Sequence, residues 1–125
     1  AVAQPKTIME TRKRIAELYM DDRIVDYIVD IVHATREPQS FGLNDLVPLV
    51  EFGASPRATI SLAQASRAHA FLRGRSFVTP DDVRAIAVPA LAHRVVLRAE
   101  AWARNISPAE VLRGILDTVP APSWQ

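Results

Sequence analysis

The sequence predicts an all-α domain, a small bundle of about five to six helices. Ala accounts for 19 of the 125 residues, whereas Gly occurs only four times, and this balance favours helix over turn-rich β structure. Val and Ile recur at the three-four spacing of a helix instead of alternating as they do in a half-buried strand. A length of 125 residues suits one domain with a core of its own.

Two helices are expected in the first third of the chain. Thr7 followed by Glu10 forms a capping-box pattern, which predicts a helix over residues 7–18. Asp21 or Asp22 is expected to cap a second helix, because side-chain carboxylates accept hydrogen bonds from the first free backbone N–H groups. This helix has a broad apolar stripe formed by Ile24, Tyr27, Ile28 and Ile31.

Residues 37–54 are expected to connect the second helix to the rest of the bundle. Pro38 and Gly42 both break a helical pattern. Within the connection, the short apolar piece 46–52 is compatible with an extended segment or with a single helical turn, and the sequence leaves both alternatives open.

The later helices share one start signal, a hydroxyl residue followed by Pro. Pro fits the first helical position because the N–H that it lacks has no intrahelical partner there. The signal occurs at Ser55-Pro56, Thr79-Pro80 and Ser107-Pro108. Predicted helices span 56–73, 80–87, 89–104 and 108–117, with left-handed stops at Gly74 and Asn105, a corner at Pro89, and no helix over 119–122.

Composition excludes several functional classes. Cys is absent, so a disulfide framework, a cysteine nucleophile and a thiolate metal site are excluded. The net charge of +1 gives no strong field for nucleic acid or an anionic membrane. No apolar run reaches the roughly 20 residues that span a bilayer, and no signal-peptide core is found in the first thirty residues. We therefore expect a cytoplasmic protein without a membrane span and without a nucleic-acid partner.

The charge is divided unevenly along the chain. Residues 1–55 carry a net charge of −3 and residues 56–125 a net charge of +4. This division fits a solvated helical surface, and it also fits a contact between the second half and an anionic partner.

Residues that could carry chemistry are scattered. No glycine-rich phosphate loop is present, and the histidines have no metal-ligand spacing. Both Asp pairs stand at helix starts, where capping and the helix dipole explain them. No serine has the context of a hydrolase nucleophile. The sequence therefore predicts no catalytic and no metal-binding residue. The side chains considered are His33, His69, His93, Asp21, Asp22, Asp81, Asp82, Ser55, Ser61 and Ser66.

Arg57 is the most unusual residue. It is expected in the first turn of a helix, where the helix dipole disfavours a cation and favours an anion. Beside free backbone N–H groups, its guanidinium could complete a phosphate site supplied from elsewhere. The alternative is a solvent-exposed Arg without a partner.

Four stretches in register give the chain a family resemblance. From about residue 8 to 122, the sequence resembles the C-terminal lid of MoxR-type AAA+ ATPases. The stretches are Asp21–Val29 with Ala34-Thr35-Arg36, Gly53–Ala58, Leu72–Arg75 with Val78–Val83, and His93-Arg94.

The resemblance implies specific roles. Arg57 is similar to the sensor 2 arginine, which contacts the γ-phosphate of ATP bound to the same subunit. Pro56 would set the start of its helix, and Ala58 would leave room for close approach. Tyr27 and Ile28 would line the adenine side of the cleft, although a core role explains them equally well.

The resemblance also implies a larger parent protein. Residues 1–122 would be the lid and 123–125 a tail, and the first residue, Ala1 in place of Met, is compatible with a piece of a longer chain. The parent would bind ATP and Mg, assemble into a ring, often a hexamer, and act on a metal-binding or von Willebrand A-type partner. The lid alone would not hydrolyse ATP. The alternative is an independent helical interaction module without a nucleotide role.

Overall fold

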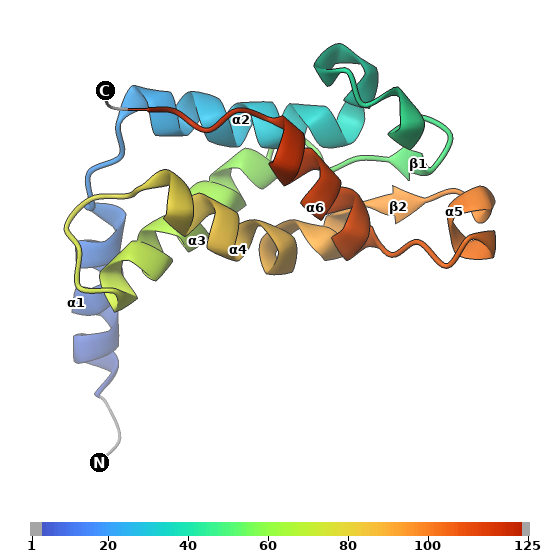
Figure 1. The fold of residues 1–125 in the computed structure, drawn as a ribbon. Coiled ribbons are helices and arrows are strands. Elements are labelled where there is room, and N and C mark those ends of the chain that lie inside the picture. The colour runs from blue at the N-terminus through green and yellow to red at the C-terminus, as the bar shows by residue number, and fades with distance from the viewer. Residues whose placement is uncertain (1–3, 124–125) are drawn as a thin grey trace.

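Six α-helices and one two-stranded sheet form the part of the chain that the computed structural model describes, residues 4–123 (Figure 1). The predicted all-α bundle is therefore confirmed. No helix among these residues is both long and apolar enough to cross a membrane. The helices are α1 (Pro5–Ala16), α2 (Asp22–Arg36), α3 (Ala58–Leu72), α4 (Pro80–Leu91), α5 (Ala99–Ala103) and α6 (Pro108–Thr118).

Helix α1 projects from the bundle and contributes no buried residue (Figure 1). It begins at Pro5, with Gln4 at the N-cap position and no side-chain cap. The predicted start at Thr7 is wrong, because Pro5 has a backbone angle suited to the first helical position and loses no needed donor there. The helix packs along α3.

Helix α2 supplies the largest share of the core. Asp21 caps it as predicted, and its carboxylate accepts the backbone N–H of Arg23 at 2.9 Å. The core lies between α2, α3, α4 and α6: α2 contacts each of the other three helices, and α4 also contacts α3 and α6. The buried side chains of α2 are Ile24, Tyr27, Ile28, Ile31, Val32, Ala34 and Thr35.

The connection after α2 ends in an extended segment, one of the two alternatives that the sequence left open for residues 46–52. Two 3₁₀ turns, η1 (Pro38–Phe41) and η2 (Asn44–Leu46), lead into strand β1 (Val50–Phe52). Strand β1 pairs antiparallel with β2 (Val96–Leu97), with Val50 opposite Leu97. This sheet ties the segment before α3 to the segment after α4.

Two of the three hydroxyl-Pro signals begin a helix as expected. Thr79 and Asp82 form a complete capping box, and the Ser107 hydroxyl accepts the N–H of Glu110 at 3.2 Å. The Ser55 side chain caps nothing, because a turn occupies Pro56 and Arg57 and α3 begins at Ala58.

Pro89 lies inside α4, so the predicted corner and the predicted helix over 89–104 are wrong. Helix α4 continues to Leu91 and is followed by η3 (Ala92–Arg94), β2 and the short α5. Pro89 removes one helical hydrogen bond, the one to the carbonyl of Ala85. Ala85 is exposed, so water can bond that carbonyl and the helix tolerates the Pro.

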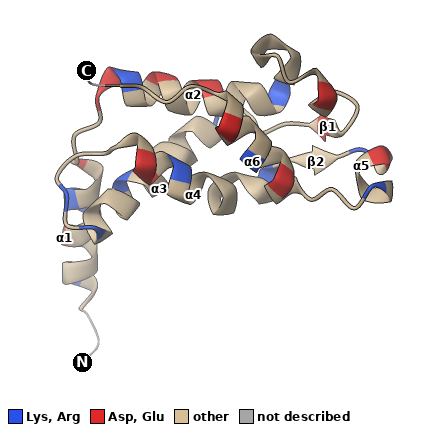
Figure 2. Ribbon diagram, viewed as in Figure 1, with Lys and Arg blue, Asp and Glu red and all other residues tan. Residues whose placement is uncertain are grey.

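The left-handed stops are confirmed. Gly74 has φ = 75° and ends the turn after α3, and Asn105 has φ = 57° after α5. Residues 119–123 are not helical, as predicted for 119–122. Lys and Arg are interspersed with Asp and Glu along α2, α4 and α6 (Figure 2).

Candidate functional site

Arg57 occupies the N-cap position of α3 with helical backbone angles, φ = −64° and ψ = −23°. Its side chain is exposed. Within residues 4–123 the structure gives its guanidinium no hydrogen bond and no ion pair. Arg57 therefore presents its charge to the surroundings with its donors free.

The loop that carries Arg57 is fixed to the C-terminal end of α2. The Thr35 hydroxyl accepts the backbone N–H of Ala54 at 2.9 Å and donates to the carbonyl of Val32 at 2.6 Å. A Cβ at Gly53 would lie 2.2 Å from the carbonyl oxygen of Thr35, which is far inside van der Waals contact. Only Gly fits this close approach. Thr35 is fully buried, so its hydrogen bond to Ala54 is shielded from water.

The backbone N–H groups at the start of α3 are not free. The N–H of Ala58 donates to the carbonyl of Ser55 at 2.9 Å, and the N–H of Thr59 donates to that of Pro56 at 3.1 Å. The expectation of free donors beside Arg57 is thus wrong for these two groups, because the preceding turn satisfies them. The capacity to bind an anion rests on the guanidinium.

Of the other residues expected near a nucleotide, one is exposed beside Arg57 and the rest are buried. Pro56 is exposed in the turn, whereas Ala58 is fully buried against the core. Tyr27 and Ile28 are 2% and 0% exposed. Of the two roles considered for Tyr27 and Ile28, their burial supports the core role.

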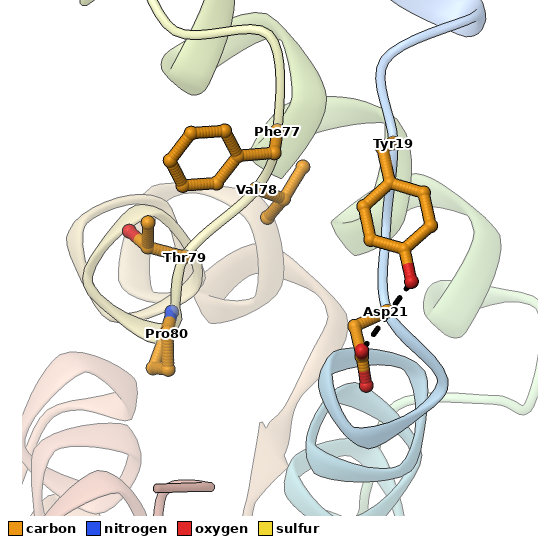
Figure 3. Close-up of a pocket in the computed structure, with 6 residues that line it drawn as sticks. All are labelled: Tyr19, Asp21, Phe77, Val78, Thr79 and Pro80. Carbon is orange, nitrogen blue, oxygen red and sulfur yellow. Dashed lines mark hydrogen bonds between the residues drawn. The ribbon is translucent and has the colours of Figure 1, made fainter. Parts of the chain in front are cut away.

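An apolar cleft of about 250 Å³ lies between the segment before α2 and the segment before α4. Tyr19 and Phe77 form a parallel β-bridge, and their rings stand on opposite sides of a gap with Val78 between them (Figure 3). The Tyr19 hydroxyl donates to the Asp21 carboxylate at 3.3 Å. Thr79 and Pro80 complete the lining.

Sequence reasoning missed this cleft, because its two halves are far apart along the chain. A signal was present. Tyr19 and Phe77 each stand two residues before a helix N-cap, at Asp21 and Thr79 respectively. Two aromatic residues at equivalent positions before two packed helix starts indicate a shared apolar surface.

A buried carboxylate joins α3 to α4. Asp82, with a fully buried side chain, accepts hydrogen bonds from His69 Nδ1 at 2.7 Å, from Arg75 Nη2 and from the backbone N–H and hydroxyl of Thr79 at 2.8 and 3.0 Å. Burial alone would raise the pKa of Asp82, but the bonds from Thr79 and His69 and the charge of Arg75 outweigh it and lower the pKa. The sequence predicted only the part of this cluster that caps α4, and it did not connect His69 or Arg75 to Asp82.

The comparisons with known proteins identify the class of this chain. Residues 47–115 match the AAA lid domain family, and the chain belongs to that family. The match covers the Arg57 loop, α3, α4 and most of α6.

The relatives narrow the assignment to the MoxR type. The chain is 40% identical over 115 residues to "Chaperone MoxR1" of Mycobacterium tuberculosis and 38% identical over 103 residues to "Protein MoxR" of Paracoccus denitrificans, covering 92% and 78% of this chain. It spans 30% of the length of each relative. A solved structure of a candidate ATPase from Cytophaga hutchinsonii superposes with a TM-score of 0.91 at 33% identity, covering 94% of this chain and 36% of that one.

Proposed function

We propose that this chain is the nucleotide-sensing C-terminal lid of a MoxR-type AAA+ ATPase, with residues 1–122 as the lid and 123–125 as a tail. The observation that carries the proposal is Arg57, an exposed guanidinium without a partner among the described residues, on a loop fixed to α2. The family membership and the relatives named MoxR support the same reading.

Arg57 would contact the γ-phosphate of ATP held by an ATPase domain of the same protein. A guanidinium is planar and always charged, so it can bond two phosphate oxygens at once and stabilise the charge of the transferring phosphoryl group. Hydrolysis removes the γ-phosphate and with it this contact. Because the Arg57 loop is held rigidly by Thr35 and Gly53, the lid as a whole would change its position. Pro56 would keep Arg57 at the start of α3.

The remaining machinery of the reaction would lie outside the described residues. Within residues 4–123 no group of three or more His, Asp or Glu side chains could hold a metal ion. By the MoxR-type resemblance, the ATPase domain would bind the Mg that accompanies ATP. We further propose that the parent protein is cytoplasmic, assembles into a homo-oligomeric ring such as a hexamer, and acts on a von Willebrand A-type partner. The MoxR-type resemblance supports these proposals.

The test is Arg57→Ala in the full-length ATPase. Loss of a charge-assisted contact of about 1.5–3 kcal/mol should lower ATP turnover roughly tenfold to hundredfold. The matched control is Arg113→Ala, which removes another exposed Arg, on α6. In both variants, the free energy of unfolding of the 125-residue chain, measured by thermal denaturation, should change by less than about 0.5 kcal/mol. Turnover equal to that of the Arg113 variant would refute the sensor role.

A further inference from the structure

A second arginine lies beside the helix face that carries Arg57. Arg94, at the end of η3, donates from Nη2 to the hydroxyl of Ser61 at 3.3 Å. Ser61 stands one helical turn after Arg57, and its N–H reaches the Arg57 carbonyl at 3.4 Å. Residues four apart in a helix share a face, with Cβ atoms about 5–6 Å apart. The fold thus places the guanidinium of Arg94 beside Ser61, one helical turn from the residue that carries the guanidinium of Arg57.

Neither arginine is neutralised by the described part of the chain. Arg57 and Arg94 are both exposed and form no ion pair within residues 4–123. Other arginines of this chain do reach a carboxylate, and they are Arg23, Arg75, Arg84 and Arg104. Two neighbouring like charges without a counter-charge are unfavourable. An anion from outside the lid would remove this repulsion.

We infer that Arg94, held by Ser61, is a second phosphate-binding residue next to Arg57, and that the two together distinguish ATP from ADP. The inference rests on the function proposed above. A triphosphate offers anionic oxygens to more than one cation, and one guanidinium occupies at most two of them. With Arg94 held beside Ser61, one helical turn from Arg57, ATP would gain two contacts that ADP, without the γ-phosphate, cannot form.

Ser61 acts here as a positioning residue. An Arg side chain has many rotamers, and ordering it opposes binding. The hydroxyl of Ser61 reduces the number of rotamers that Arg94 must give up when the phosphate arrives. This role predicts that a residue keeping the hydroxyl will keep the affinity for ATP.

The experiment measures the affinity of the full-length ATPase for a non-hydrolysable ATP analogue and for ADP by titration calorimetry. Arg94→Ala should weaken binding of the analogue about tenfold, the equivalent of about 1.4 kcal/mol, and binding of ADP less than twofold. Ser61→Ala should have a smaller effect of the same kind, and Ser61→Thr should bind as the wild type does. Arg113→Ala is again the control.

Each possible result decides the question. If Arg94→Ala binds the analogue as Arg113→Ala does while Arg57→Ala is impaired, the inference fails and the proposed function stands. If Arg57→Ala is also unimpaired, both fail. A change in ring assembly with unchanged nucleotide affinity would assign Arg94 to a protein contact and overturn the inference. Arg94→Lys, which keeps the charge, should bind the analogue with intermediate affinity and guards against misfolding of the Ala variant.

Discussion

Replacing Asp82 with Asn should destabilise the chain strongly, although the two side chains have nearly the same shape. The carboxylate is fully buried and accepts four hydrogen bonds, from His69, Arg75 and two groups of Thr79. An amide removes the negative charge and turns an N–H₂ group toward these donors. Breaking a buried ion pair costs about 3–5 kcal/mol. The side chains of His69 and Arg75 are 21% and 32% exposed, so water can solvate them when the carboxylate is lost. We therefore expect the free energy of unfolding to fall by about 3 kcal/mol, the lower end of that range.

The assay is thermal and urea unfolding of the 125-residue chain, followed by the helical circular dichroism signal. A loss of about 3 kcal/mol corresponds to a fall in melting temperature of about 12 °C for a domain of this length. The control is Asp81→Asn, the neighbouring residue in the first turn of α4, which is exposed. Its effect should stay below about 1 kcal/mol. A loss below about 1 kcal/mol for Asp82→Asn would show that the cluster does not hold α3 to α4.

The same cluster predicts the sign of the acid dependence. Because the folded state lowers the pKa of Asp82 below its ordinary value, the unfolded chain binds a proton more readily as the pH falls. The stabilisation by Asp82 is complete above the unfolded pKa of about 3.9 and is lost as the pH falls through the lower folded pKa. The free energy of unfolding should therefore decline as the pH falls below about 4, and less steeply in Asp82→Asn than in Asp81→Asn.

Two further predictions concern the Arg57 loop and the helix caps. Gly53→Ala should lower stability by at least about 2 kcal/mol, since its Cβ would lie 2.2 Å from the Thr35 carbonyl oxygen; an unchanged urea midpoint would show that the loop is not fixed to α2. Thr79→Ala should cost about 1–2 kcal/mol because it removes a complete capping box. Ser55→Ala, by contrast, should change the free energy of unfolding by less than about 0.5 kcal/mol, and a larger loss would contradict the turn that precedes α3.

Short sequence patterns predicted many of the helix ends, because the hydrogen bonds and backbone angles at a helix end involve residues only a few positions apart. Asp21, Thr79 and Ser107 cap helices where the sequence placed them, and Gly74 has the left-handed backbone that ends a helix. The hydroxyl-Pro pattern failed at Ser55, where Gly53 and Ala54 are held against α2 and the chain turns once more before α3 begins. That constraint comes from a contact between distant segments.

Long-range contacts also explain what sequence reasoning missed at the candidate site. Arg57 was singled out from its expected position in the first turn of a helix, a local feature. Its neighbour Arg94 is brought to α3 through Ser61, which is 33 residues earlier in the chain, and no short motif records such an approach. Tyr27 and Ile28 have the same spacing whether they line a cleft or fill a core, so only their observed burial separates the two roles.

The close contact of Gly53 with Thr35 has a mechanical consequence. Helix α2 is a rod of 15 residues, about 22 Å long. One end is locked to the Arg57 loop, and the other begins at Asp21, beside the cleft of Tyr19 and Phe77. In the proposed function, a force on the Arg57 guanidinium would therefore be passed to α2 through this contact instead of being absorbed by the loop. The contact between Gly53 and Thr35 would then make α2 the element that moves together with Arg57.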